Sequence, residues 1–186
     1  MMQRRQFAIG SVVTLAAAAF TRVAGAAAQG QTAGQAPPLP APAGPNQAAM
    51  FKLTLSEDAW RKRLTPAQFN VLRKHGTERA GSSPLDKIYT PGNYHCSGCD
   101  LALFSSKAKF NSGTGWPSFW DPITDEMGVA VATTSDNTFF MKRTEVHCRH
   151  CGGHQGHVFD DGPMPTGLRY CINGVALKFV PDKAAT

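Results

Sequence analysis

The sequence predicts a mainly β domain of the α+β class: a curled, barrel-like antiparallel sheet with short N-terminal helices and a four-cysteine metal site. Hydrophobic residues make up 42% of the 186 positions and charged residues 17%, a composition that can fill a packed core. From residue 88 onward, short runs of β-branched and aromatic residues alternate with turn residues, as in an antiparallel sheet. Two C-x-x-C pairs indicate a metal site that would join distant parts of the chain.

The first 28 residues have the features of an export signal. Arg4 and Arg5 form a positive start, and a mostly apolar run over residues 7–20 follows it. The alanines at 26–28 provide a small-residue cleavage site. Because the paired arginines resemble a twin-arginine signal, we expect residues 1–28 to be a signal peptide that directs the protein to the periplasm. An ordinary secretory signal and a cytosolic disordered tail are the alternatives.

The next segment has the composition of a tether. Residues 29–50 are mainly Gln, Ala, Gly and Pro, with too few large apolar side chains to offset the entropy of ordering, so we expect a flexible linker. The folded domain is expected over residues 51–183. No apolar stretch reaches the ~18–20 residues of a membrane-spanning helix, so we expect no stable membrane insertion.

The formal net charge of +6 does not indicate a nucleic-acid partner. Three of the 19 basic residues, Arg4, Arg5 and Arg22, lie in the expected signal, and none of the 13 acidic residues does. No dense Lys/Arg run remains in the domain to follow a phosphate backbone, so we expect no nucleic-acid binding.

Two short helices are expected at the start of the domain. Ser56 can cap a helix that runs to Leu64, with two acidic residues in its first turn. Residues 65–68, Thr-Pro-Ala-Gln, form a capping box that begins a second helix, and Gly76 is expected to end it. A polar loop is expected over residues 77–87.

The strands are expected where β-branched and aromatic residues gather between turn residues. Asn173-Gly174 is a typical two-residue hairpin turn, so the last two runs are expected to pair with each other. The expected strands are Ile88–Tyr94, Val129–Thr133, Thr138–Thr144, His157–Phe159, Leu168–Ile172 and Val175–Val180.

Four of the five cysteines are expected to form one structural zinc site. Cys96 with Cys99, and Cys148 with Cys151, are C-x-x-C pairs, a spacing that supplies two corners of a tetrahedron around zinc. Together the two pairs leave no coordination position open to water, as in a structural site. Two redox dithiols, two disulfides, or replacement of one ligand by His95, His147 or His150 are the alternatives.

The fifth cysteine, Cys171, has neighbours that suggest an activated nucleophile. Arg169 and Asn173 lie two residues to either side and so on the same strand face, where they could stabilise a thiolate. His154 and His157 supply two imidazoles at an expected loop-to-strand transition. A buried structural cysteine is the alternative.

A rigid turn over residues 111–120 presents a tryptophan side chain. Two glycines and a proline surround Trp116, which we interpret as an apolar wall of a substrate pocket. Phe119, in the same segment, is expected to be a buried aromatic corner.

These motifs together resemble the B-type family of peptide-methionine (R)-S-oxide reductases, over roughly residues 54–181. The resemblance implies a mostly β fold, a zinc site with four cysteine ligands and reduction of the R epimer of methionine sulfoxide. It rests on Cys96-x-x-Cys99, the segment Ser112–Phe119, Arg143-Thr144-Glu145-Val146, Cys148-x-x-Cys151, His154-x-Gly156-His157-Val158-Phe159, Asp161-Gly162-Pro163 and the segment Arg169–Asn173.

The resemblance also implies roles for single residues. Cys171 corresponds to the nucleophile, and Trp116 to the wall for the ε-methyl group of the substrate. His154, His157 and Asn173 correspond to polar residues around the sulfoxide oxygen and its water. Arg169 corresponds to the arginine near the thiolate. Phe159 is expected to be a further substrate contact.

Two departures from the family pattern matter. Gln155 stands where the family often has Leu, which we interpret as a surface adjustment. Thr114 stands where many members have the resolving cysteine, so the sulfenic acid expected on Cys171 would have no internal thiol to react with. A thioredoxin-like or other external thiol donor is therefore implied, with oxidised envelope proteins as substrates.

Two other functions compete with this interpretation. A non-enzymatic zinc-ribbon-like binding module would explain the four cysteines equally well, but not why Cys171, the histidine pair and Trp116 occur together. A thiol-disulfide oxidoreductase would use the C-x-x-C pairs themselves, which zinc binding would exclude.

Overall fold

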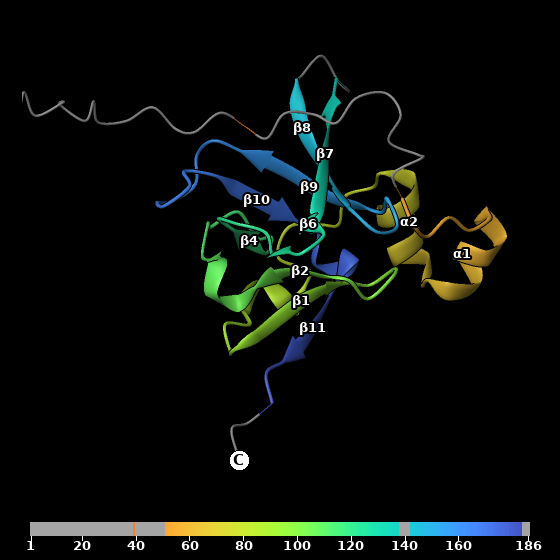
Figure 1. The fold of residues 1–186 in the computed structure, drawn as a ribbon, viewed down its shortest axis with the longest axis horizontal. Helices are drawn as coiled ribbons and strands as arrows, with labels where there is room; N and C mark the ends of the chain where they lie inside the picture. Colours follow the sequence, from red (N-terminus) through yellow and green to blue (C-terminus); the bar gives the residue numbers. More distant parts are fainter. Residues whose placement is uncertain (1–38, 40–50, 138–141, 184–186) are drawn as a thin grey trace, which may run out of the picture. The chain divides into compact units, whose positions relative to one another are not determined.

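The computed structural model describes residues 39, 51–137 and 142–183 (Figure 1). The chain divides by its contacts into residues 1–33 and 34–186, and the first of these units lies outside the described residues. The expected signal peptide, and all of the expected linker except Leu39, lie outside them as well. No helix among the described residues is long and apolar enough to cross a membrane.

Two short helices begin the described domain, as the capping motifs predict. Helix α1 spans Glu57–Arg63, and the side chain of Ser56 accepts a hydrogen bond from its first turn. Helix α2 spans Pro66–Lys74, and both hydrogen bonds of the capping box at its start are present. The prediction that Gly76 ends α2 is wrong: His75 adopts the left-handed conformation, with φ 56°, and ends the helix one residue earlier.

The rest of the domain is mainly antiparallel sheet, as expected, although the sheets do not close into a barrel. A six-stranded sheet has the order β3-β4-β10-β9-β8-β7, a three-stranded sheet has the order β11-β1-β2, and β5 pairs with β6. Figure 1 shows the two larger sheets with both helices to one side of them. The strands are β1 Gly92–Cys96, β2 Ala102–Ser105, β3 Lys109–Phe110, β4 Ser118–Phe119, β5 Thr124–Asp125, β6 Gly128–Val129, β7 Val131–Asp136, β8 Arg143–Cys148, β9 His154–Phe159, β10 Arg169–Ile172 and β11 Leu177–Pro181. Short 3-10 turns lie at Pro84–Lys87, Ser106–Ala108 and Gly174–Ala176.

Most predicted strands exist, but their bounds differ. The run expected at Val129–Thr133 is divided between β6 and β7, and the first strand starts at Gly92 instead of Ile88. The strand expected at Thr138–Thr144 lies partly outside the described residues, and β8 begins at Arg143. The sequence pattern does not predict strands β2 to β5, because segments of two to four residues are too short to show a period.

The predicted hairpin at Asn173-Gly174 is wrong. Strand β10 pairs with β4 and β9, whereas β11 pairs with β1 in the other sheet. A 3-10 turn at Gly174–Ala176 carries the chain between the two sheets. The backbone amides of Gly174 and Val175 donate to the carboxylate of Glu78, so a distant side chain determines this turn.

An aromatic cluster forms the centre of the core. Phe119 is fully buried, as predicted, and stacks on Phe104 with ring centroids 4.5 Å apart. Tyr94 meets the same Phe119 ring edge-on at 4.9 Å. Helix α2 packs against β9 and the 3-10 turn after β10. Strand β9 and the turn after β10, which carry or adjoin the predicted site residues, are thus held in place by both the core and helix α2.

Candidate active site

The pairing of β9 with β10 places the predicted nucleophile beside a histidine. Cys171 lies directly opposite His157, and Arg169 lies opposite Phe159. Because side chains two residues apart in a strand share a face, these four side chains lie on one face of the sheet. The close approach of the strands requires Gly156, where an added Cβ would lie 2.1 Å from the carbonyl oxygen of Cys171.

A small cavity of about 140 Å³ opens at Cys171. Its volume suits a small group such as the end of a thioether side chain. Four predicted site residues line it together with Cys171: Trp116, His157, Phe159 and Asn173. Thr77, Arg143 and Gly156 complete the lining.

The turn that carries Trp116 is held against the loop after α2. Gly113 and Gly115 have positive φ values of 72° and 85°, which glycine adopts at no steric cost. The indole Nε1 of Trp116 donates to the carbonyl oxygen of Glu78 at 3.3 Å. The indole ring is therefore fixed as an apolar wall of the cavity.

The thiol of Cys171 is not strongly activated in the resting protein. Burial raises its pKa, while the hydroxyl of Thr114, 3.9 Å from Sγ, and the charge of Arg169 act in the opposite direction. Arg169 lies near the thiol, as expected, but both its Nε and Nη2 donate to Asp161 at 2.8 Å. This ion pair weakens the field of the guanidinium at Sγ, so the thiol form predominates at neutral pH.

A chain of hydroxyl groups leads away from Cys171 beneath the turn. Oγ1 of Thr114 lies 2.8 Å from Oγ of Ser112, which lies 2.7 Å from Oγ of Ser118. Ser118 is fully buried and is the partner of Cys171 in the pairing of β4 with β10. Thr114 is thus held with its hydroxyl close to the thiol.

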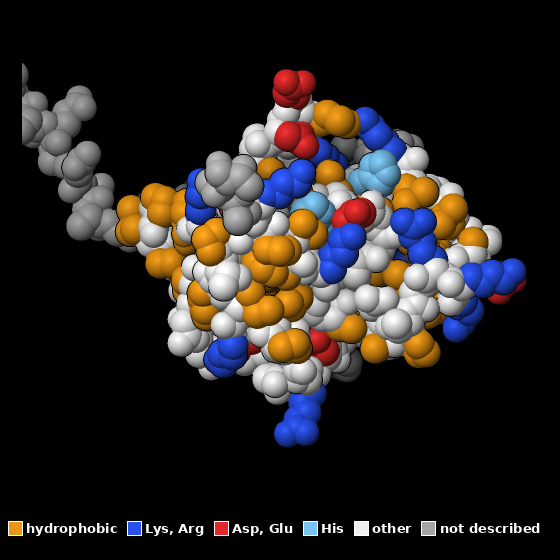
Figure 2. Space-filling view, turned by 90° about the horizontal axis from the view of Figure 1, so that it is seen from below, with side chains coloured by type: hydrophobic (Ala, Val, Ile, Leu, Met, Phe, Trp, Pro, Cys, Tyr) orange, Lys and Arg blue, Asp and Glu red, His pale blue; other side chains and the backbone are white. Residues whose placement is uncertain are grey.

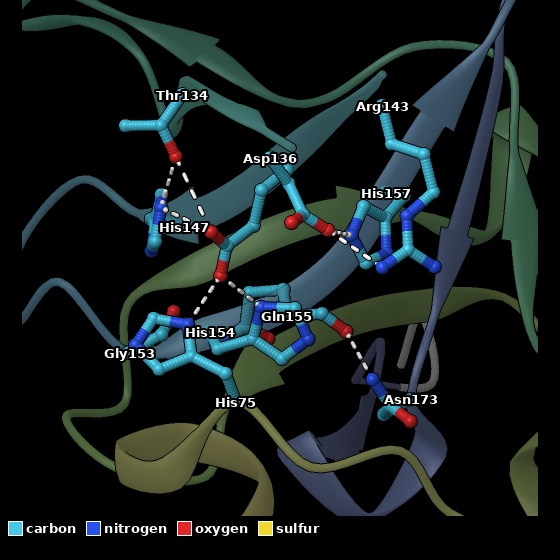
Figure 3. A network of polar contacts seen from close by, with 11 residues as sticks. His75, Thr134, Asp136, Arg143, His147, Gly153, His154, Gln155, His157 and Asn173 are labelled. Carbon is cyan, nitrogen blue, oxygen red and sulfur yellow. Dashed lines mark hydrogen bonds and ion pairs between the residues drawn. The ribbon is translucent and has the colours of Figure 1, made fainter. Parts of the chain in front are cut away.

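His157 is held as a neutral imidazole at the cavity wall. Its Nε2 lies 2.9 Å from the carboxylate of Asp136, which also accepts from Arg143 at 2.6 Å (Figure 3). Burial lowers the pKa of His157, and the hydrogen bond with Asp136 opposes this effect only in part. A neutral imidazole can accept a proton from a neighbouring acid and pass it on.

His154 lies behind His157 and does not line the cavity of Cys171. Both histidines belong to β9, which begins at His154 directly after a loop, so the predicted loop-to-strand transition is present, and their ring centroids are 5.5 Å apart. His154 is only 2% exposed, and its Nδ1 is hydrogen-bonded to Glu145. The structure therefore gathers Trp116, His157 and Phe159 at the thiol, and places His154 one layer deeper.

Glu145 is a buried carboxylate surrounded by three imidazoles. Its partners are His75, His147 and His154, with the hydroxyl of Thr134 on its second oxygen (Figure 3). Burial raises the pKa of Glu145, but its hydrogen bonds with these histidines outweigh that effect and hold the pKa well below its usual range. Contact with Glu145 in turn raises the pKa of His75.

Sequence reasoning missed the roles of Asp136, Glu145 and His75 in this network. Glu145 lies in the motif Arg143-Thr144-Glu145-Val146, and this motif is the sequence signal that could have identified it as a site residue. His75 lies 70 residues away from Glu145 at a helix end, and no local pattern indicates that they meet.

Asn173 is fixed by its neighbours and is not a strand residue. Its backbone N and Nδ2 both donate to the carbonyl oxygen of Gln155, at 2.8 and 3.0 Å. Its Oδ1 accepts from the backbone amide of Glu78 at 3.0 Å. Asn173 is buried, so the amide that reaches the cavity has a single orientation.

The interpretation of Gln155 as a surface adjustment is wrong. Gln155 is fully buried in β9, and its Nε2 donates to Sγ of Cys96 at 3.5 Å and to the carbonyl oxygen of Gly153 at 3.2 Å. It points toward the four paired cysteines because β9 begins three residues after Cys151. Its side chain contacts the cysteine cluster while its backbone holds Asn173.

The four paired cysteines form one cluster, as the spacing predicts. Sγ of Cys96 lies 3.7 Å from Sγ of Cys151, and Sγ of Cys99 lies 3.4 Å from Sγ of Cys148. A tetrahedron with metal–sulfur bonds of ~2.3 Å has edges of ~3.8 Å, so the four residues fit a zinc ion. None of the five cysteines forms a disulfide in the structure, and the sulfurs of the cluster lie too far apart for one.

Comparison with known proteins places these residues in a family. The model of the SelR domain matches residues 64–181. A protein named peptide methionine sulfoxide reductase MsrB from Leptospira interrogans (serovar Lai) is 50% identical over 129 residues, which cover 69% of this chain and 96% of that protein. The proteins of the same name from Methanosarcina mazei and Pseudomonas aeruginosa (strain PAO1) are each 51% identical over 135 residues, or 73% of this chain. The match covers 94% of the Methanosarcina protein and 100% of the Pseudomonas protein.

Proposed function

Because this chain belongs to the SelR-domain family and is an oxidoreductase that acts on methionine sulfoxide, we propose that it reduces the R epimer in oxidised proteins with Cys171 as nucleophile. One observation carries this proposal: the pairing of β9 with β10 places Cys171 opposite His157, in a cavity that Trp116 closes on one side. A structural cysteine would need neither the histidine nor the cavity.

The reaction transfers the sulfoxide oxygen from the substrate to the protein. The thiolate sulfur of Cys171 attacks the sulfoxide sulfur, and a proton is delivered to the sulfoxide oxygen. The oxygen leaves the substrate sulfur and ends on Sγ as a sulfenic acid. The substrate sulfur gains two electrons and becomes methionine, and Cys171 loses two electrons.

His157 is placed to carry that proton. It shares the cavity with Cys171, and Asp136 holds its ring by a hydrogen bond of 2.9 Å. Because burial lowers the pKa of His157, its resting form is a neutral imidazole, and we assign to it the transfer of the proton from the thiol of Cys171 to the sulfoxide oxygen. His154 supports His157 from behind and is itself held by Glu145.

The remaining cavity residues hold the substrate. Trp116 and Phe159 offer apolar surface to the ε-methyl group, and the small cavity volume of about 140 Å³ suits the end of a methionine side chain. Asn173, whose orientation is fixed, offers an amide to the sulfoxide oxygen. An unsymmetrical pocket with methyl and oxygen sites on different sides distinguishes the two epimers at sulfur.

Recycling requires a thiol from another molecule. Thr114 lies close to Cys171 but carries no sulfur, and the other four cysteines belong to the cluster. An external thiolate therefore attacks the sulfenic sulfur and releases water, which leaves a mixed disulfide that a second thiol resolves. A thioredoxin-like donor suits this step.

The four-cysteine cluster is proposed to hold one structural zinc ion. Cys96, Cys99, Cys148 and Cys151 would be its ligands, and the hydrogen bond from Gln155 to Cys96 would stabilise one thiolate. The ion supplies a cross-link between distant segments, not a reactive centre, because four protein ligands leave no open position.

We also propose that the protein is exported by the twin-arginine route and repairs oxidised envelope proteins. The support is the arginine pair Arg4-Arg5, followed by the mostly apolar run over residues 7–20. That route carries folded proteins, so zinc could be inserted before export. A fusion of residues 1–50 to a folded reporter, with Arg4 and Arg5 replaced by Lys, tests the route: export that survives the replacement would reject it.

The reduction itself is tested by turnover of peptides that contain the separate R and S epimers, with dithiothreitol as reductant. We expect reduction of the R epimer alone, and none by Cys171→Ser despite a normal zinc content. Activity on the S epimer, or activity that persists in Cys171→Ser, would contradict the proposal. Absence of reduction of either epimer by a folded, zinc-loaded protein would favour a non-enzymatic binding module.

A further inference from the structure

Glu145, His75 and His154 form a second group of potential metal ligands, apart from the cysteines. Oε1 of Glu145 lies 2.6 Å from Nδ1 of His75 and is also hydrogen-bonded to Nδ1 of His154. The three donor atoms all lie within 4.8 Å of one another. They come from β8, the end of α2 and the start of β9, and Figure 3 shows both rings directed at the carboxylate from the side away from Thr134.

This arrangement is close to what one transition-metal ion requires. Zinc–nitrogen and zinc–oxygen bonds of ~2.0–2.2 Å keep the donors of one ion within ~4.4 Å of each other. Small outward movements of the two rings would therefore make room for an ion where protons now join them to Glu145. Two imidazoles and a carboxylate suit zinc, cobalt or nickel better than magnesium or calcium.

The carboxylate is also supported in the way that metal-binding carboxylates usually are. Oγ1 of Thr134 donates to Oε2 of Glu145 at 3.3 Å, and Nε2 of His147 lies 3.4 Å from the same oxygen. These contacts hold Oε2 and leave Oε1 directed at His75 and His154. Such outer contacts orient a ligand and typically contribute about 10–100-fold to metal affinity.

An ion can reach the group from solvent. The side chain of His75 is 60% exposed, whereas those of Glu145 and His154 are buried. A hollow of about 360 Å³ opens at the group, and Asp136 and His157 lie along its wall. The site thus has two inner ligands and one ligand at the entrance.

We propose that Glu145, His75 and His154 form a binding site for a divalent transition-metal ion, separate from the four-cysteine cluster, and that its occupancy inhibits the reductase. A bound ion would turn the ring of His154 outward from Glu145. Because that ring packs against the ring of His157 with centroids 5.5 Å apart, the movement would disturb the placement of His157 beside Cys171. Inhibition rests on the proposed function, but binding does not.

Binding is tested with the full-length protein after its zinc content has been brought to one per chain. Cobalt(II) is titrated and followed by calorimetry and by visible absorption. We expect one further cobalt per chain, with ligand-field bands but without the thiolate-to-cobalt charge-transfer band that entry into the cysteine cluster would produce.

The decisive variant is His75→Ala, because His75 is exposed and its loss leaves the buried part of the network in place. The matched control is His95→Ala, since His95 is bonded to Asp100 and lies outside the group. We expect the second cobalt to bind at least tenfold more weakly to His75→Ala and unchanged to His95→Ala. Equal binding to both variants, or no second cobalt in the wild type, would overturn the proposal.

The inhibitory consequence has its own readout. Reduction of the R-epimer peptide is measured with and without added cobalt, each variant relative to its own cobalt-free rate. Wild type and His95→Ala should slow on addition of cobalt, and His75→Ala should not. A second cobalt that binds without slowing the wild type would overturn the inhibition alone, and a protein inactive on both epimers would count against the proposed function.

Discussion

At the scale of single residues, opposing charges determine how reactive Cys171 is. Burial raises the pKa of its thiol, Arg169 lowers it, and Asp161 raises it. The bidentate contact between Asp161 and Arg169 therefore limits how much thiolate the resting protein contains. A thiol that stays largely protonated in the resting protein is less open to indiscriminate oxidation.

Two substitutions should move the pKa of Cys171 in opposite directions. Arg169→Gln removes a positive charge and should raise the pKa further, whereas Asp161→Asn frees the arginine and should lower it. The pH dependence of alkylation of Cys171 by iodoacetamide measures both, since only the thiolate reacts. In the wild type the midpoint should lie above the ordinary value of 9.0. A shift of the same sign in both variants would show that the charge pair does not control the thiol.

Thr114→Cys should change how the sulfenic acid is recycled. Oγ1 of Thr114 lies 3.9 Å from Sγ of Cys171, so a thiol at this position would lie close to Sγ, and an S–S bond of ~2.05 Å then requires the turn and Cys171 to move closer together. One equivalent of R-epimer substrate should yield a disulfide between position 114 and Cys171, seen by mass spectrometry. Thr114→Ser, which keeps the hydroxyl, should form none and should retain a sulfenic acid that dimedone traps. Failure of Thr114→Cys to form the bond would show that the turn is held too far from the thiol.

At the scale of elements, local signals predict the helices well and the strand pairing poorly. The caps at Ser56 and Thr65 are contained within four residues, so the sequence displays them directly. The Asn173-Gly174 pair has the composition of a hairpin turn, but Glu78 binds the amides that follow it and fixes another conformation. A contact across 96 residues cannot be recognised from a dipeptide.

Gly156→Ala should separate β9 from β10. Its Cβ would lie 2.1 Å from the carbonyl oxygen of Cys171, so the strands must move apart and take the thiol away from His157. We expect a loss of at least ~3 kcal/mol in the free energy of unfolding, a size typical of severe steric strain, together with loss of reduction. Urea unfolding measures the first effect.

Gly81→Ala is the matched control for that substitution. Gly81 has a positive φ of 73° but no atom within 4 Å of an added Cβ. Only the backbone strain of about 1–2 kcal/mol should appear there. An equal loss in the free energy of unfolding for Gly81→Ala and Gly156→Ala would show that the close contact between β9 and β10 at Gly156 has no special importance.

At the scale of the whole molecule, the cysteine cluster joins segments that lie far apart in the chain. Cys96 ends β1 of the three-stranded sheet, and Cys148 ends β8 of the six-stranded sheet. The helices support the same region: Arg63 and Arg73 donate to the carbonyl oxygens of Gly98 and Cys151. The described domain is small, so one metal cross-link can contribute much of its stability.

Cys99→Ser should therefore affect folding more than chemistry. Structural zinc binding contributes ~10–16 kcal/mol in small zinc peptides, which is as large as the net stability of ~5–15 kcal/mol of a typical domain. The variant should be poorly soluble and depleted of zinc by elemental analysis. Cys171→Ser, the matched control, should keep one zinc per chain and a normal melting transition. A soluble, zinc-free and active Cys99→Ser protein would contradict a structural role for the metal.

The parts of the site that could be predicted are those that one short segment contains. Cys171, Trp116 and the cysteine pairs are recognisable from residue type and spacing. Glu145, Asp136 and His75 could not be assigned, because their contacts depend on the register of β8 with β9 and on where α2 ends.

The space-filling view adds one feature that composition alone does not give. On the face drawn in Figure 2, Lys and Arg side chains lie scattered among uncharged and apolar ones and form no continuous stripe. On this face the positively charged side chains therefore form no single patch.

The most direct test of the account is a single-turnover experiment without reductant. Wild-type protein is mixed with an excess of the R-epimer peptide, and the methionine formed and the state of Cys171 are measured by mass spectrometry. We predict one methionine per chain, a sulfenic acid on Cys171 that dimedone traps, and no disulfide, with zinc still bound. An internal disulfide, or formation of methionine without oxidation of Cys171, would contradict the single-thiol mechanism.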